Sequence, residues 1–140
     1  MLIHGRCHCG NISFQLTWQP NPVEIPTNAC GCSFCIKHGG VWTTNPHGAL
    51  KVTTEDAALV SRYAFSTRTT KFHFCSRCDI VPVVASRIDD RIYAVVSINA
   101  FEIDSLLLRR ASTNFDGEGT DSRLARRQRN WIADVEFSAN

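Results

Sequence analysis

Cys30-Gly31-Cys32-Ser33-Phe34-Cys35 places three cysteines within six residues. The other four of the seven cysteines form two pairs, Cys7-His8-Cys9 and Cys75-Ser76-Arg77-Cys78. Thiolates separated by one or two residues can bind one tetrahedral metal ion, because the backbone bends around the ion in a short turn. A disulfide within a C-x-C pair is disfavoured, since it requires specific Cβ positions. The three clusters therefore predict bound zinc.

The number of cysteines indicates how they divide between two zinc ions. The first and last pairs together supply four sulfur ligands: Cys7, Cys9, Cys75 and Cys78. Four thiolates complete a tetrahedron, so we expect a structural zinc there, which would contribute folding free energy directly. The middle cluster supplies Cys30, Cys32 and Cys35, and three protein ligands leave one position open, as in catalytic zinc sites. A partition that joins a pair to two of the middle cysteines is less favoured, because it leaves one cysteine without a metal ion and a second site with only two cysteines.

Histidines leave an alternative open for the middle cluster. A fourth ligand from His38, His47 or His73 would close the site and make it structural as well. His38 is the nearest, three residues after Cys35. His38 and His73 are also the candidate acid–base residues, because imidazole exchanges protons near neutral pH. A surface or hydrogen-bonded role is nevertheless the commoner one for any single histidine.

Composition limits the class of protein. The chain has 140 residues, of which 44% are hydrophobic, and this suits one domain, 1–140, with a real core. The sequence shows neither a long apolar run typical of a transmembrane helix nor the pattern of a signal peptide. We therefore expect a cytoplasmic protein without a membrane partner, whose cysteines stay reduced and do not form the disulfides of a secreted protein.

The charge pattern argues against nucleic acid as a partner. The formal net charge is only +2, which is not the global charge of a nucleic-acid-binding protein. The local exception is the stretch 123–129, with arginine at four of seven positions. We interpret this stretch as a solvated helix with salt-bridge partners, for which Asp121 and Glu118 are close in sequence.

Short alternating or β-branched runs, separated by turn residues, predict an all-β fold of small antiparallel sheets. Strands are expected in five runs: 12–16, 60–65, 72–74, 81–85 and 92–98. The last two are longer and more apolar, so we expect them at the centre of a sheet. Pro82 should lie at the start or the edge of its strand, because proline cannot donate to a sheet ladder.

Helical segments are expected only near the C-terminus, at 104–110 and 121–131. In the second segment we expect Asp121 or Ser122 to cap the helix. Leu124, Gln128 and Trp131 should share one face, since their spacing follows the helical repeat.

The order of the three cysteine clusters resembles the glutathione-dependent formaldehyde-activating enzyme family, which also includes centromere protein V domains. The resemblance runs from about Gly5 to Phe101, and the segment 114–117 also looks like a recurrent feature of bacterial members. The supporting segments are Gly5–Phe14, Cys30–Cys35, Tyr63–Phe65 and Phe74–Cys78. The resemblance implies a zinc-binding β-tent, with a structural zinc on the four paired cysteines and a second zinc on the middle three.

One position departs from the family pattern. Members usually have glycine after the last cysteine, where this chain has Asp79. A metal-binding turn often requires a positive φ at this point, and aspartate tolerates that conformation better than most residues. We therefore expect the structural site to be retained.

The activity that the resemblance implies is that of a carbon–sulfur lyase, which joins formaldehyde to glutathione as S-hydroxymethylglutathione or catalyses the reverse. Glutathione carries two carboxylates, so its site should present cations or backbone N–H groups. The candidate cations near the cysteines are Lys37, Arg68, Lys71 and Arg77, although each is also consistent with an ordinary solvated charge. Two alternatives are a non-catalytic binding module with two structural zinc ions and a protein that stores zinc or thiols.

Overall fold

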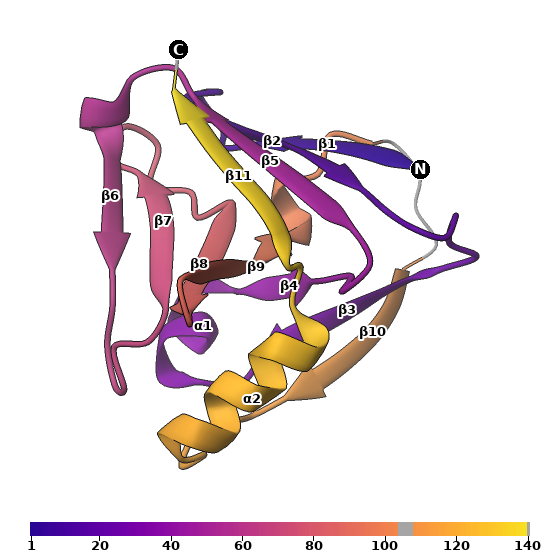
Figure 1. Cartoon of the computed structure of the whole chain (residues 1–140). Helices are drawn as coiled ribbons and strands as arrows, with labels where there is room; N and C mark the ends of the chain where they lie inside the picture. Colours follow the sequence, from indigo (N-terminus) through magenta and orange to yellow (C-terminus); the bar gives the residue numbers. More distant parts are fainter. Residues whose placement is uncertain (104–107, 140) are drawn as a thin grey trace.

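The computed structural model describes residues 1–103 and 108–139, and Figure 1 shows the arrangement of its helices and strands. In chain order the elements are β1 (Leu2–Arg6), β2 (Ile12–Thr17), β3 (Ile25–Cys30), α1 (Ser33–His38), β4 (Val41–Thr43), β5 (Ala49–Thr54), η1 (Ala57–Leu59), β6 (Val60–Tyr63), β7 (Lys71–Cys75), β8 (Val83–Ile88), β9 (Arg91–Ser97), η2 (Ile98–Ala100), β10 (Leu108–Thr113), α2 (Thr120–Asn130) and β11 (Asp134–Ala139). In these ranges, no helix has the length and apolar character needed to cross a membrane.

The strands form two sheets. The smaller has the order β1-β2-β5-β11, and the larger has the order β10-β3-β4-β9-β8-β7-β6. The prediction of a mainly β fold is confirmed, but the sheets are not wholly antiparallel, and one of them has seven strands. β10 pairs in parallel with β3, and β11 in parallel with β5. Both parallel strands return to a sheet edge after a long connection, and such a connection allows parallel pairing.

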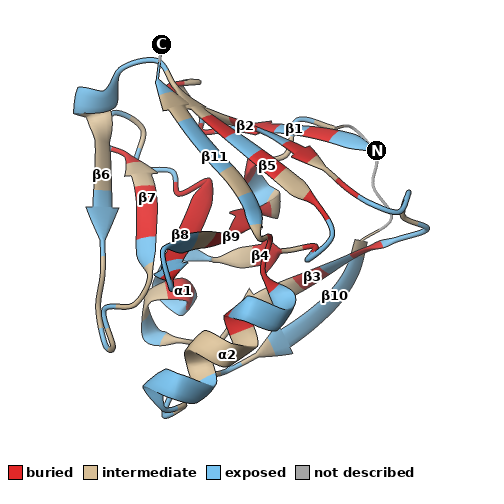
Figure 2. Ribbon diagram, in the orientation of Figure 1, coloured by how far each residue is buried: buried red, intermediate tan, exposed pale blue. Residues whose placement is uncertain are grey.

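β8 and β9, which lie inside the seven-stranded sheet, are buried on both faces, as the red segments of Figure 2 show. Val83 and Val96 belong to the core between the two sheets, whereas Val84 and Val95 belong to a second core on the other face. The expectation of central strands in the two most apolar runs is therefore confirmed. Pro82 directly precedes β8, at the strand start, as expected.

The first of the two helix predictions is wrong where it can be compared with the structure. Residues 104–107 of that segment lie outside the described ranges, but Leu108–Arg110 form the start of β10. These residues pair with Ile25–Thr27 of β3. Pairing with a strand that is distant in sequence thus overrides the local helical pattern.

The second helix prediction is confirmed by α2, with two corrections. The helix is capped by Gly119, without a side-chain hydrogen bond, and not by Asp121 or Ser122. Arg127 is buried while Gln128 is exposed, so the packed face contains Arg127 in place of Gln128. The long guanidinium side chain reaches two hydroxyl groups beneath the helix, which explains how a charged residue can lie on this face.

Candidate metal centres and the cysteine cavity

The four paired cysteines meet at one point. The sulfur atoms of Cys7, Cys9, Cys75 and Cys78 all lie within 4.8 Å of one another. The Cys7–Cys9 sulfur distance is 3.8 Å and the Cys9–Cys75 distance is 3.5 Å. A tetrahedral zinc with Zn–S bonds of about 2.3 Å holds its sulfurs roughly 3.8 Å apart. The donor set and its spacing therefore fit a closed four-sulfur site.

Each of these pairs lies in a turn that contains a residue of left-handed backbone conformation. In the first turn that residue is Gly10, with φ 86°, and its N–H donates to the Cys7 carbonyl at 3.1 Å. In the second it is Asp79, with φ 63°, and its N–H donates to the Cys75 carbonyl at 2.7 Å. The expected positive φ at Asp79 is thus found. Both turns thus require a residue with positive φ, which is glycine in the first turn and aspartate in the second.

The three middle cysteines form a second group, whose sulfur atoms also lie within 4.8 Å of one another. Cys30 ends β3, Cys32 is the N-cap residue of α1, and Cys35 lies inside that helix. The Cys32 sulfur accepts a hydrogen bond from the Cys35 N–H at 3.4 Å, and the Cys35 sulfur accepts one from Trp42 Nε1 at 3.4 Å. Such N–H donors stabilise sulfur in its thiolate form, which is the form that binds metal.

The three thiols share negative charge unequally. The hydrogen bond from Cys35 lowers the pKa of Cys30 to about 6, against the opposing effect of burial. That same contact raises the pKa of Cys35, and burial raises the pKa of Cys32. Without metal, the negative charge at neutral pH is therefore favoured on Cys30, while Cys32 and Cys35 remain protonated thiols. A soft, divalent ion would compensate the charge of all three, so the donor chemistry fits zinc.

These sulfurs lie in the wall of a cavity of about 110 Å³, on the face of the seven-stranded sheet that packs against α2. Its apolar wall consists of Trp42, Phe65, Phe72, Val84, Val95 and Phe115. Its charged side chains are Asp116 and Arg123. The negative charge of Asp116 opposes ionisation of Cys30 and raises its pKa, although this effect is smaller than that of the hydrogen bond from Cys35.

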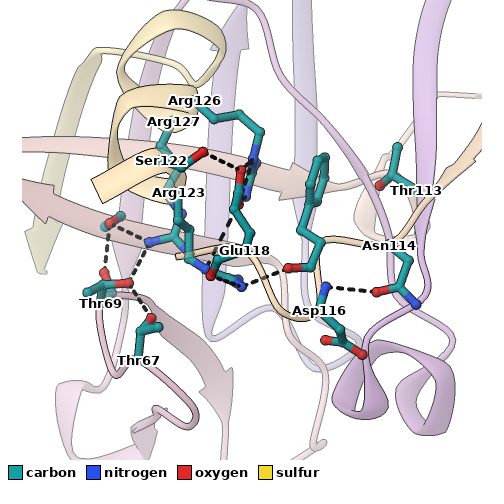
Figure 3. A network of polar contacts seen from close by, with 12 residues as sticks. Thr67, Thr69, Thr113, Asn114, Asp116, Glu118, Ser122, Arg123, Arg126 and Arg127 are labelled. Carbon is teal, nitrogen blue, oxygen red and sulfur yellow. Dashed lines mark hydrogen bonds and ion pairs between the residues drawn. The ribbon is translucent and has the colours of Figure 1, made fainter. Parts of the chain in front are cut away.

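Asp116 is held in place by a network of polar contacts around residues 114–119, which Figure 3 shows. The Asp116 N–H donates to Asn114 Oδ1 at 2.8 Å. Arg123 donates from Nη2 to the Phe115 carbonyl at 2.8 Å, and Arg126 Nη2 lies 3.0 Å from Glu118 Oε1. The Arg126 guanidinium also lies 3.7 Å from the centre of the Phe115 ring. The start of α2 therefore fixes the loop that closes one side of the cavity.

The arginine-rich stretch consequently has a structural role. Glu118 pairs with both Arg123 and Arg126, as expected, whereas Asp121 takes part in none of the ion pairs found among the described residues. Arg127 is buried and not solvated, and its Nη1 donates to Thr69 Oγ1 at 2.8 Å. The interpretation of this stretch as a salt-bridged helix holds for Glu118, whereas the expected pairing with Asp121 and the expected solvation of Arg127 require correction.

The structure brings neither candidate acid–base histidine to the cysteine cavity. His38 ends α1, and its ring packs against Phe34 at 4.7 Å between centres. His73 lies on the face of β7 opposite to Phe72, which lines the cavity. Burial, together with the charges of Arg62 and Lys71, lowers the pKa of His73 to about 4. Within the described residues, the group around Cys30, Cys32 and Cys35 contains no histidine as a fourth ligand.

The candidate glutathione-binding cations are likewise elsewhere. The cavity lining includes none of Lys37, Arg68, Lys71 and Arg77, and its cation is Arg123. Sequence reasoning did not select Asp116 or Arg123 as site residues. Both nevertheless lie in segments that stood out in the sequence, the family-like segment 114–117 and the arginine-rich stretch 123–129.

Comparisons with known proteins place this chain in one family. Residues 2–112 match the glutathione-dependent formaldehyde-activating enzyme family. A relative from Halomonas elongata, whose name assigns it provisionally to these enzymes, is 38% identical over 85 residues, which are 56% of this chain and 52% of the relative. This chain thus matches about half the length of that relative. A crystal structure of a Rhodobacter sphaeroides protein has a TM-score of 0.57 and 27% identity, covering 73% of this chain and 90% of its own. Because the family match extends over most of the sequence, this chain belongs to the glutathione-dependent formaldehyde-activating enzyme family.

Proposed function

We propose that this protein binds two zinc ions and is a carbon–sulfur lyase, which joins glutathione or a similar thiol to formaldehyde or another small aldehyde, or catalyses the reverse. The observation that carries the proposal is the position of three cysteine sulfurs in the wall of a cavity that also contains Asp116 and Arg123. The four-cysteine group supplies a complete tetrahedron, so its proposed role is structural. A cytoplasmic location, where thiols stay reduced, is part of the same proposal.

A zinc ion held by Cys30, Cys32 and Cys35 would leave a fourth position for a substrate thiol and would lower the pKa of that thiol. The cavity of about 110 Å³ has room for the reacting thiol and a small aldehyde, but not for a whole tripeptide. The remainder of glutathione must therefore extend from the cavity mouth. The apolar wall formed by Trp42, Phe65 and Phe72 would exclude water from the aldehyde.

We assign the proton transfer to Asp116, because its carboxylate lines the same cavity as the three sulfurs. In the synthetic direction its carboxylate accepts the proton of the thiol, and the sulfur then forms a bond to the carbonyl carbon. The electron pair of the carbonyl π bond moves to oxygen, and the resulting alkoxide takes the proton from Asp116, so no net proton is consumed. Arg123 also lines the cavity, and we assign its guanidinium the role of stabilising the negative oxygen.

The proposal is tested by the rate of exchange between formaldehyde, glutathione and their adduct. This reaction also proceeds spontaneously, so the exchange should be followed at equilibrium by NMR, with and without the zinc-loaded protein. We expect the wild type to accelerate exchange and Cys32→Ser to reduce the rate to the spontaneous value. Retention of one zinc per chain by this variant would show that the four-cysteine site is intact. A full rate in Cys32→Ser would rule the middle cluster out of the reaction.

A second measurement separates an enzyme from a non-catalytic binding module. Cobalt in place of zinc reports each tetrahedral thiolate site by its visible absorption, which changes when a ligand enters. Titration with glutathione should give a saturable change in one of two sites. Two unresponsive sites would contradict an open coordination position and would favour a module in which both metal ions are structural.

A further inference from the structure

A second and larger cavity, of about 530 Å³, lies on the opposite face of the seven-stranded sheet from the cysteine cavity. We call it the basic cleft and define it by Arg62, Arg68, Lys71, Arg87, His73 and Phe137. The cleft lies between β11 and the β6–β7–β8 end of the large sheet, with Leu124 of α2 also in its wall, and the positions of these elements can be followed in Figure 1.

Strand alternation separates the basic cleft from the cysteine cavity. Side chains of successive residues in a strand point to opposite faces. On β7, Phe72 accordingly lines the cysteine cavity, whereas Lys71 and His73 line the cleft. Arg62 lies opposite His73 in the register of β6 and β7, so it is on the same face. A ligand between Arg62, Lys71 and His73 would therefore lie on the other side of β7 from Phe72 and the cysteine cavity.

Four cations converge on the cleft without acidic partners. None of Arg62, Arg68, Lys71 and Arg87 takes part in an ion pair with the described residues. Single exposed lysines and arginines are ordinary surface residues. Four such cations around one concave site are less ordinary than single surface charges. Their like charges raise the local positive potential, which attracts a counter-ion of multiple negative charge.

The wall of the cleft adds an aromatic face to these charges. Phe137, on the edge strand β11, is 37% exposed. Its ring stacks on His73, with 5.1 Å between centres and an angle of 24° between planes. His73 is only 8% exposed. A buried imidazole and a partly exposed phenyl ring thus border the same cavity.

We propose that the basic cleft binds a small organic phosphate with a planar ring, that is, a nucleotide. Guanidinium groups bind phosphate oxygens in a bidentate manner, and a lysine adds a point charge. A planar ring can stack on the exposed side of Phe137. The volume is within the roughly 300–1,000 Å³ of small-molecule sites. This inference does not depend on the activity proposed for the cysteine cavity.

Calorimetric titration of the zinc-loaded protein with three probes tests the proposal. ADP carries both ring and phosphates, pyrophosphate carries only the charge, and adenosine carries only the ring. We expect saturable binding of ADP, with weaker binding of pyrophosphate and the weakest binding of adenosine. Absence of saturable ADP binding would overturn the proposal, and ADP affinity no greater than that of pyrophosphate would overturn its ring component.

Matched variants locate the binding. Arg62→Gln combined with Lys71→Gln should weaken ADP binding at least tenfold. Arg110→Gln combined with Arg129→Gln removes the same charge from two exposed positions outside the cleft and should change the affinity less than twofold. Equal losses in both double variants would show non-specific attraction and would contradict the site. Phe137→Leu should weaken ADP binding but leave pyrophosphate binding unchanged.

Two competition experiments decide what kind of ligand uses the cleft. Saturating glutathione should leave the affinity for ADP unchanged, because the cysteine cavity is on the other face of the sheet. Competition between the two would overturn the assignment of a separate site. A single-stranded oligonucleotide that binds more tightly than ADP and depends on the same cations would replace the nucleotide with nucleic acid as the ligand.

Discussion

Trp42 Nε1 donates a hydrogen bond to the Cys35 sulfur at 3.4 Å, and both side chains are buried. Gly40 makes this contact possible, because a Cβ at that position would lie 2.9 Å from Trp42 Nε1 and 3.1 Å from Cys35 Cβ. The indole therefore both lines the cysteine cavity and orients one of its sulfurs. Hydrogen bonds to metal-binding residues commonly change metal affinity by roughly 10- to 100-fold.

Trp42→Phe tests this relationship, because it keeps an aromatic ring and removes only the N–H donor. We expect the affinity of the middle cluster for zinc to fall by about tenfold or more. The four-cysteine cluster should keep its affinity. Competition with a chromophoric chelator resolves the two sites. Trp18→Phe, at a buried tryptophan of the core between the sheets, is the control and should change neither affinity. Equal weakening of both sites in Trp42→Phe would point to general unfolding instead.

Asp116→Asn should lower the rate of adduct exchange by about 100-fold or more, since general acid–base groups commonly contribute this much. Zinc content and the thermal midpoint should remain unchanged, because the Asp116 side chain is exposed and its backbone N–H makes the contact to Asn114. Asp121→Asn removes an exposed carboxylate of α2 and serves as the matched control. An unchanged exchange rate in Asp116→Asn would remove the carboxylate from the mechanism.

Glu118→Gln should destabilise the protein by about 1–2 kcal/mol, because hydrogen bonds between charged groups are stronger than neutral ones and both Arg123 and Arg126 lose their paired carboxylate. The hydrogen bond from Arg126 is the main cause that lowers the pKa of Glu118 below its ordinary 4.5. The stability gained from ionised Glu118 is thus fully present above pH 4.5 and is lost as the pH falls through the lower pKa of the folded state.

Urea denaturation of wild type and Glu118→Gln at several pH values measures this effect. The difference in unfolding free energy should be constant near neutral pH and should decrease in acid. Glu24→Gln breaks the more exposed pair with Arg109, at 3.6 Å, and should cost less than about 0.5 kcal/mol. A Glu118 effect as small as that of Glu24 would refute the role given to the network.

Asp79→Gly should stabilise the zinc-loaded protein by about 0.5–1 kcal/mol. At φ 63° an L-residue has a steric cost that glycine avoids, although glycine loses more backbone entropy on folding. Gly10→Ala, at the corresponding position of the other turn, should be destabilising by a similar or larger amount, because it introduces a Cβ at φ 86°. Denaturant midpoints at fixed zinc concentration measure both, and a loss of stability in Asp79→Gly would contradict the steric argument.

In the metal-free protein, Cys30 should react with iodoacetamide at lower pH than Cys32 or Cys35. The hydrogen bond from Cys35 lowers the pKa of Cys30 to about 6, so its thiolate predominates above that pH. Mass spectrometry after brief labelling at each pH gives the midpoint for each cysteine. Cys35→Ala removes the donor and should shift the Cys30 midpoint upward. A Cys30 midpoint near the ordinary value of 9.0 in the wild type would refute this assignment.

The cysteine spacing by itself predicted both groups of sulfurs, and the structure brings the same seven residues together as four and three. Such groups can be predicted because short turns place neighbouring thiolates around one point regardless of the remaining fold. The strands of the two apolar runs and the strand start at Pro82 could be predicted from local patterns, and the left-handed turn at Asp79 was expected because the resembled family usually has glycine there. Each depends on a few adjacent residues and on the limits of the backbone.

Only the tertiary structure decided which side chains accompany the three sulfurs. Asp116 and Arg123 reach the cavity because Glu118 and Arg126 fix a loop against α2, across more than 80 residues of sequence from Cys35. His73 is excluded because the register of β7 gives Phe72 to that face. Pairing of β10 with β3 likewise replaced an expected helix. Register and packing between distant segments depend on the summed burial of many residues, and this sum has no local signature in the sequence.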